Sequence, residues 1–224
     1  MSGNLVLGVD ASASSLYLAI KGEGISLSRS FISIRNTDTM LLDEIKSIIS
    51  YAGATPNDIS YFALSEGPGS FTSLRIASST LKGLSFAKDI KIKSVPTLDV
   101  LYHSFEGHVR DVVVPLIDAR MHRFYTAMFK NGEKILEDSD LKIEDILSKT
   151  DEKITFVYHP LEEKNILSLI DKELLRNIKH RVKFAHPSLI TNPALTLIDL
   201  SSSYGFDSPE KGPKYVREHS GVIK

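Results

Sequence analysis

Residues 6–20 read VLGVDASASSLYLAI, and residues 114–128 read VPLIDARMHRFYTAM. Four positions are identical at a spacing of 108 residues: Asp10 and Asp118, Ala11 and Ala119, Tyr17 and Tyr125, Ala19 and Ala127. In each stretch an apolar strand ends in Asp-Ala, an alternating strand follows, and a glycine turn leads to a third strand. Four identities can arise by chance, but the shared strand-turn-strand order favours an internal duplication.

Both copies continue into alternating helices and strands. The first half predicts strands at 4–10, 15–21, 25–35, 59–65 and 90–95, with helices at 38–52, 71–88 and 97–106. The second half predicts strands at 111–119, 122–130, 133–138, 154–157 and 181–185, with helices at 141–149, 161–178 and 188–203. Three antiparallel strands followed by alternating helices and strands is the ribonuclease-H-like plan. Two such lobes give an α/β protein of actin-like (ASKHA) architecture.

The predicted boundary between the lobes lies near Gly107. It assigns residues 1–107 to an N-terminal lobe and residues 108–206 to a C-terminal lobe. The tail from about 207 to 224 begins as an extended segment, because it carries Pro209, Gly212 and Pro213, and it can pack back on the first lobe.

Composition narrows the class of protein. Hydrophobic residues make up 42% and charged residues 25%, as in ordinary globular proteins. The sequence lacks a signal-peptide pattern and a long apolar run, which predicts neither export nor a membrane span. It has no cysteine, which excludes disulfides and cysteine-ligated zinc and suits a cytoplasmic protein. With a net charge of −1 and no basic stripe, strong tRNA binding by this chain alone is disfavoured.

A glycine turn, EGPGSFTSLRI at residues 66–76, joins a predicted strand to a predicted helix. Ser70 or Thr72 is well placed to cap the first turn of that helix. Free amides at such a helix start can hold an anion, which is the functional interpretation. The alternative is a capped turn that binds nothing, and the local pattern by itself favours that alternative.

An actin-like kinase or hydrolase needs small-residue phosphate turns in both lobes. The first turn, residues 10–15, either contacts phosphate through Asp10 and Ser12 or is a plain hairpin turn, and these interpretations weigh equally. The second turn, residues 118–123, has no glycine, and we expect its bulky side chains to fill the phosphate space. There we expect an ion pair between Asp118 and Arg120, with Arg123 pointing to solvent.

Other catalytic patterns are weak. Residues 158–160, Tyr-His-Pro, stand where an adenosine site needs a pair of glycines, so no complete nucleotide site is expected. His103 and His108 are five residues apart, whereas two ligands on a helix need a spacing of three or four, so a frayed helix end is favoured over a metal site. No Ser-His-Asp order stands out along the chain, although the sequence does not exclude a triad whose members are brought together by folding.

Two helices have broad apolar faces. The helix at 38–52 carries Leu41, Leu42, Ile45, Ile48 and Ile49, and the helix at 71–88 carries Leu74, Ala77 and Leu81. Most of this apolar area must cover the sheet of the same lobe. The breadth of the faces leaves a second use open, namely an interface with a partner.

The sequences of several segments resemble those of the bacterial TsaB family, also called YeaZ. The most specific segment includes Gly67, Pro68, Gly69, Ser70, Phe71, Thr72, Arg75 and Ile76, and it is similar to the family signature GPGSFTGLRIG. Asp118, Ala119 and Arg120 belong to a second similar segment, residues 115–121, and residues 213–217 resemble the family's Pro-x-Tyr-Leu-Arg ending. The likeness covers most of the chain.

This resemblance implies a non-catalytic actin-like protein that acts in the synthesis of N6-threonylcarbamoyladenosine (t6A) at position 37 of tRNA. The family member forms a heterodimer with TsaD, the catalytic paralogue, and the ATPase TsaE joins the pair. First-lobe helices build the interface, which implies that the eight apolar residues of 38–52 and 71–88 face TsaD or a second copy in a homodimer. No cofactor and no metal are implied for the chain itself, while a nucleotide at the partner interface is left open.

Two enzyme functions compete with this hypothesis. One is an actin-like small-molecule kinase, and the other is a glycopeptidase of the M22 type, with which such sequences have been grouped. The incomplete phosphate turns and the histidine spacing argue against both. A homodimeric scaffold shares the same helix face, so the sequence does not separate it from the TsaD partner.

Overall fold

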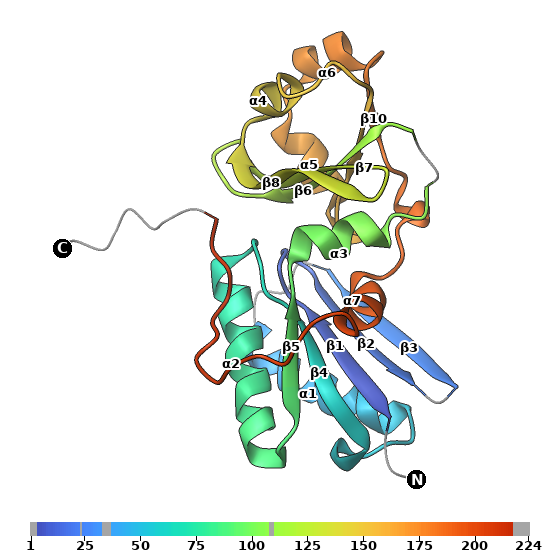
Figure 1. Ribbon diagram of the computed structural model, residues 1–224, viewed down its shortest axis with the longest axis vertical. Coiled ribbons are helices and arrows are strands. Elements are labelled where there is room, and N and C mark those ends of the chain that lie inside the picture. The colour runs from blue at the N-terminus through green and yellow to red at the C-terminus, as the bar shows by residue number, and fades with distance from the viewer. Residues whose placement is uncertain (1–3, 23, 33–36, 108–109, 217–224) are drawn as a thin grey trace, which may run out of the picture.

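The computed structural model describes residues 4–22, 24–32, 37–107 and 110–216 (Figure 1). It contains two five-stranded sheets, one in each lobe. The first has the order β3-β2-β1-β4-β5, with β1 (Leu5–Asp10), β2 (Leu16–Gly22), β3 (Ile25–Phe31), β4 (Ile59–Ser65) and β5 (Lys91–Val95). The second has the order β8-β7-β6-β9-β10, with β6 (Val112–Asp118), β7 (Phe124–Lys130), β8 (Glu133–Leu141), β9 (Ile154–Val157) and β10 (Val182–Phe184).

Strand order and direction match between the sheets. In each lobe the first two hairpin-connected pairs are antiparallel, and the fourth and fifth strands extend the sheet in parallel. This arrangement confirms the predicted ribonuclease-H-like plan in both halves and the actin-like architecture of the whole. The central strands β1 and β6 read as nearly continuous apolar runs because helices cover both faces of their sheets.

Each sheet lies between two helical layers. One face of the first sheet carries α1 (Thr37–Tyr51) and α2 (Phe71–Lys88), and the opposite face carries α7 (Pro193–Ser201). The outer face of the second sheet packs against α4 (Ile143–Leu147), α5 (Glu163–Leu169) and α6 (Lys172–Ile178). Its inner face packs against α3 (Thr97–Ser104), which therefore lies between the lobes (Figure 1).

The helix after the fifth strand crosses over in both lobes. Leu98 and Leu101 of α3 pack against Ile117 and Phe129 of the second sheet. In return, residues of α7 pack on the first sheet. A boundary near Gly107 separates the two sheets along the chain but not in packing, because α7 follows that boundary and covers the first lobe.

Local capping explains where the helices differ from the predicted ranges. The predicted helix at 161–178 is two helices, because Asp171 accepts hydrogen bonds from the amides of Glu173 and Leu174 and starts α6 afresh. The predicted helix at 188–203 begins at residue 193, where the Asn192 side chain accepts from the amide of Ala194. Short 3₁₀ turns occupy residues 56–58, 160–162 and 187–189.

The segment after α7, residues 206–216, runs around the free edge of β5 and then along α2 (Figure 1). We call it the strap. The Asp207 carboxylate accepts from the amide and hydroxyl of Ser94 on β5, and the amide of Asp207 donates to the carbonyl oxygen of Ile92. Lys82 of α2 donates to the carbonyl oxygen of Pro209. The strap therefore occupies part of the edge of the first sheet.

Candidate functional site: the turns between the lobes

A cavity of about 420 Å³ lies between the two lobes. Its walls are the β1–β2 turn and the start of α2 from the first lobe, and the β6–β7 turn and the start of α5 from the second. Tyr215 of the strap lines it as well. Strand ends converge here because β1, β4, β6 and β9 all end at the junction, as in other open α/β folds.

Three buried side chains meet at one wall of this cavity. The hydroxyl of Ser12 donates to Asp10 Oδ1 at 2.6 Å, and the Ser12 amide donates to the same oxygen at 2.9 Å. His159 reaches across from the second lobe, with its Nε2 3.1 Å from Asp10 Oδ2 and 3.1 Å from Ser12 Oγ. All three residues are at most 1% exposed. We refer to them as the junction cluster.

The electrostatics of the junction cluster favour an ionised aspartate. Burial by itself would raise the pKa of Asp10, but the charge of His159 and the hydrogen bonds from His159 and Ser12 outweigh burial and lower that pKa. The carboxylate thus keeps its negative charge at neutral pH while fully buried.

The proton positions decide what the junction cluster can do. The single hydroxyl proton of Ser12 is directed at Asp10, so Ser12 Oγ accepts from His159, and Nε2 of the imidazole is a donor to both neighbours. A catalytic triad needs the reverse, with the histidine accepting from the serine through one ring nitrogen and donating to the aspartate through the other. The three residue types of a triad meet here without its connections.

A second layer of contacts surrounds the junction cluster. The Tyr17 ring stacks on the His159 ring with centroids 5.5 Å apart, and the Tyr17 hydroxyl accepts from the Leu161 amide at 3.1 Å. Ser15 donates to Glu162 Oε1 at 2.7 Å, and both residues are buried. Burial raises the pKa of Tyr17, so its hydroxyl stays protonated. Polar side chains therefore join the β1–β2 turn to the β9–α5 turn.

The glycine turn packs against the same β1–β2 turn from the other side. The amide of Ser70 donates to the carbonyl oxygen of Ser12 at 2.6 Å, and a Cβ atom at Gly69 would overlap that oxygen. Ser70 is the N-cap of α2, but its hydroxyl pairs with that of Ser73 at 2.9 Å and makes no capping bond to the backbone. The predicted side-chain cap by Ser70 is therefore wrong, because this hydroxyl is used elsewhere.

The strap docks on the glycine turn and the start of α2. Lys214 donates its amide to the carbonyl oxygen of Glu66, and a Cβ atom at Gly67, whose φ is +110°, would overlap the carbonyl oxygen of Lys214. The Arg75 guanidinium lies 3.8 Å from the centre of the Phe71 ring and donates to the Tyr215 hydroxyl at 3.0 Å. The signature segment and the tail segment thus contact each other.

The β6–β7 turn confirms one prediction and corrects another. Asp118 pairs with Arg120 at 3.2 Å, as predicted, and Ala119 is buried. Arg123 does not point freely to solvent, because its Nε donates to Asp140 Oδ1 at 2.7 Å. Arg120, Met121 and His122 are exposed, and Arg120 lines the cavity. That these side chains fill a phosphate space stays a prediction. Beside Asp10 and Ser12 lies His159 of the second lobe.

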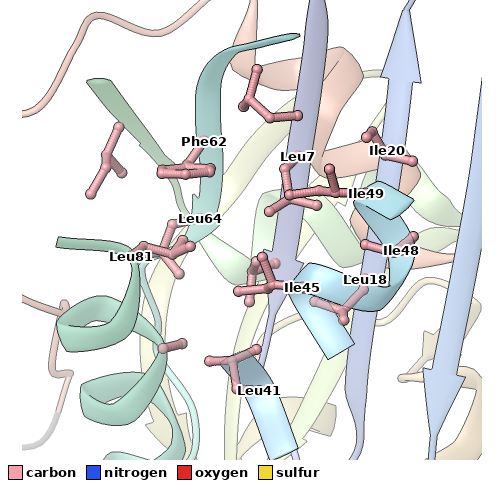
Figure 2. Packing of buried hydrophobic residues seen from close by; sticks show 14 of the residues in the cluster. Leu7, Leu18, Ile20, Leu41, Ile45, Ile48, Ile49, Phe62, Leu64 and Leu81 are labelled. Carbon is pink, nitrogen blue, oxygen red and sulfur yellow. The ribbon is translucent and has the colours of Figure 1, made fainter. Parts of the chain in front are cut away.

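The apolar residues predicted to face a partner lie mostly inside the first lobe. Figure 2 shows side chains of α1 and α2 pointing at β1, β2 and β4. Seven are buried: Leu41, Ile45, Ile48, Ile49, Leu74, Ala77 and Leu81. Leu42 is half-buried. All of these seven except Leu74 belong to the hydrophobic core of the first sheet, so they are core residues and not a partner-facing surface of this chain.

No group of three or more His, Asp or Glu side chains within the described ranges could hold a metal ion. His103 lies on α3, where burial lowers its pKa and Asp99 partly opposes that effect. His108, the other histidine of the predicted pair, lies outside the described residues. Among the helices described, none combines the length and the apolar character that crossing a membrane requires.

Two residues of the site were missed as functional candidates. His159 and Glu162 follow a short buried strand, and only that position after β9 could have drawn attention to them. Their pairing with Ser12 and Ser15 spans 147 residues of chain.

Comparisons with known proteins agree on one family. Residues 32–201 match the family described as TsaD, tRNA N6-adenosine threonylcarbamoyltransferase. The tRNA threonylcarbamoyladenosine biosynthesis protein TsaB of Bacillus subtilis is 26% identical over 162 residues, which cover 69% of this chain and 70% of that protein. TsaB of Haemophilus influenzae is 30% identical over 135 residues, 60% of this chain and 56% of that protein.

A solved structure extends the likeness to the fold of nearly the whole chain. YeaZ from Pseudomonas aeruginosa superposes with a TM-score of 0.71 at 23% identity, covering 96% of this chain and all of that one. The matched range, the curated relatives and this fold together show that the chain belongs to the TsaD-related family of proteins, within its TsaB, or YeaZ, branch.

Proposed function

We propose that this protein is a non-catalytic subunit of t6A synthesis, which binds TsaD and activates it for threonylcarbamoyl transfer to A37 of tRNA. The observation that carries the proposal is the junction cluster in a chain of the TsaB branch. Asp10 and Ser12, the residues with which the first turn would contact a phosphate, are saturated by His159.

The junction cluster also weakens the two enzyme alternatives. A kinase needs the first turn free to hold a phosphate, and His159 occupies its polar groups here. A hydrolase acting through Ser12 needs a base, whereas His159 donates to Ser12 and the hydroxyl proton is directed at Asp10. Both points favour a binding role over chemistry in this chain.

Reconstitution tests the proposed function. TsaD, TsaE, unmodified tRNA and threonylcarbamoyl-adenylate are mixed with and without this protein, and t6A is measured by mass spectrometry of the digested tRNA. We expect t6A only when the protein is present and none from the protein without TsaD. Equal t6A formation in its absence would refute activation, and t6A from the protein alone would show an enzyme.

The proposed partner surface is the outward side of α1 and α2. Because the inward stripes of these helices are core, the residues available to TsaD are the exposed ones. Phe86 of α2 is 95% exposed and Tyr51 of α1 is 75% exposed, both large values for aromatic side chains. An exposed aromatic residue is a typical anchor of a protein interface.

A matched pair of substitutions tests this surface. We expect Phe86→Asp to weaken the co-elution of TsaD on a sizing column without changing the thermal stability of the isolated protein. Met121→Asp, at a residue 78% exposed in the second lobe, serves as the control and should leave co-elution intact. Equal loss in both variants, or none in Phe86→Asp, would place the interface elsewhere.

The same surface is proposed to support a homodimer that competes with TsaD, while TsaE joins the heterodimer. Phe86→Asp should then shift any dimer of the isolated protein towards the monomer in analytical ultracentrifugation. We propose no cofactor for the isolated chain. Titration calorimetry with ATP and with ADP, on the chain alone and then on the complex with TsaD, separates this proposal from a nucleotide bound at the interface.

A further inference from the structure

The two lobes are connected through buried polar side chains in addition to the chain itself. His159 is 1% exposed, and Asp10 and Ser12 are 0% exposed, so the junction cluster is closed off from solvent. Its members come from the turn after β1 in the first lobe and the turn after β9 in the second. Separating the lobes would break both hydrogen bonds of His159 to the first lobe.

The position of His159 resembles that of a bound ligand. Asp10 and Ser12 present oxygen atoms at the end of β1, next to a cavity of about 420 Å³. One N–H group from the opposite lobe satisfies both oxygens at 3.1 Å. The bridge between the lobes is thus supplied by the chain itself.

We propose that His159 is a built-in bridging group, which binds Asp10 and Ser12 across the junction and holds the two lobes in one fixed arrangement. The lobes then need no ligand in the cavity to stay closed. This property does not depend on the partner named above, because it concerns the conformation of the isolated chain.

Neighbouring contacts act in the same direction. Tyr17 stacks on the His159 ring and accepts from the Leu161 amide, which fixes the imidazole against the first sheet. Ser15 and Glu162 add a second buried bridge at 2.7 Å between the same two turns. Four residues of the first lobe therefore hold one turn of the second.

A second tie lies at a different edge of the junction. Lys214 of the strap pairs with Asp138 on β8 at 2.8 Å, and Asp138 also pairs with Lys134 at 3.0 Å. Lys134 continues to Asp99 of α3 at 2.6 Å. Since the strap is docked on the first lobe, this chain of ion pairs links the lobes at a second place, apart from the junction cluster.

Distance measurement between two spin labels tests the proposal directly. The sequence has no cysteine, so Ser79→Cys on α2 and Glu144→Cys on α4 give one label in each lobe, both at exposed positions. Pulsed electron–electron double resonance is recorded on labelled protein diluted with unlabelled protein. The dilution suppresses distances between labels on different molecules. We expect one narrow distance, unchanged by added ATP.

Removal of the bridging group should loosen the lobes. In the labelled background, His159→Ala should broaden the distribution or add a longer distance, and added imidazole should restore the narrow one by filling the space that the ring left. Phe156→Leu is the control, because Phe156 is buried in the core of the second lobe and lies on β9, the strand that leads to His159. It should keep the narrow distance with or without imidazole.

The outcomes are distinct. A narrow distance in His159→Ala, or a broad one in the protein before substitution, would overturn the proposal, as would equal broadening in Phe156→Leu. If His159→Ala does not fold, Ser12→Ala provides the answer, since it removes only one oxygen of the cluster. It should broaden the distribution by less, and an unchanged width together with unchanged thermal stability would overturn the proposal.

Discussion

The turn that leaves β4, residues 66–70, and the turn that leaves β9, residues 158–162, stand at equivalent places in the two lobes, yet they meet the β1–β2 turn in different ways. The first approaches with backbone, because Gly69 carries no side chain and the Ser70 amide reaches the carbonyl oxygen of Ser12. The second approaches with side chains, because His159 and Glu162 reach Ser12 and Ser15.

The difference shows that equivalent turns of one topology can cover the β1–β2 turn in two ways, with backbone or with side chains. A glycine turn lets two backbones touch, and the amide that could have held an anion is used for a hydrogen bond inside the protein. A turn with bulky polar residues fills the space next to the strand ends. Between them, the β1–β2 turn is held on both sides and has few polar groups left for a ligand.

The largest expected effect comes from the two duplicated aspartates. Asp10→Ala should lower the free energy of unfolding by roughly 3 kcal/mol, because it leaves a buried imidazole donor without its carboxylate. Asp118→Ala, the matched change in the second lobe, should cost about 1 kcal/mol or less, since its partner Arg120 is exposed. Urea denaturation of both variants measures this, and similar losses would show that the two turns are equivalent.

Backbone contact at the glycine turn is tested by two alanine substitutions. Gly69→Ala should destabilise the protein by about 1–3 kcal/mol, because its Cβ would meet the carbonyl oxygen of Ser12. Gly83→Ala, inside α2 and with open space around it, should instead stabilise by about 0.5–1 kcal/mol. Thermal unfolding followed by circular dichroism compares them. A stabilised Gly69→Ala would contradict the close approach.

Acid should weaken the contact between Asp10 and the turn that leaves β9, and so lower the stability of the protein. Its pKa is lowered in the folded protein, so the folded state holds that proton less tightly than the unfolded chain. The stabilisation is complete above the ordinary aspartate pKa of about 3.9 and is lost as the pH falls through the lowered value. Unfolding curves between neutral and acidic pH should show a shallower loss in Asp10→Asn than in the unchanged protein, and parallel losses would argue against this linkage.

The smallest effect is expected where the strap packs on the glycine turn and the start of α2. Arg75→Ala removes the contacts with Phe71 and Tyr215 at the surface and should cost less than about 1 kcal/mol. Deuterium exchange of residues 206–216 should nevertheless accelerate, because the strap loses an anchor. Arg120→Ala, also at an exposed arginine, should leave that exchange unchanged. If both variants behave alike, Arg75 does not hold the strap.

Strand order was predictable from the sequence because period-two alternation and the repeated Asp-Ala endings are local signals. The predicted ranges for β4, β9 and α2 agree with the structure. The ion pair of Asp118 with Arg120 was also predictable, since the two residues are only two positions apart. By contrast, Arg123 finds Asp140 on a neighbouring strand, a contact that no local pattern indicates.

The apolar faces of the two helices were predicted correctly, but the sequence did not show which surface covers them. Ile45 and Leu81 lie on broad stripes, and a stripe has the same pattern whether a sheet of the same lobe or another protein covers it. The register of the sheet beneath α1 and α2 decided in favour of the core. Phe86, the most exposed of the large hydrophobic residues described, attracts no attention in a periodicity argument because it stands alone.

The sequence by itself determined the two lobes, the order of their strands and the family, since hydrophobic period, turn residues and short motifs are written along the chain. Tertiary structure alone decided that His159 meets Asp10 and Ser12, that α3 lies between the lobes while α7 packs on the first sheet, and that the strap docks on the signature segment. The reason is physical: a local pattern fixes which face of an element is apolar, but contacts across more than a hundred residues depend on how whole elements pack.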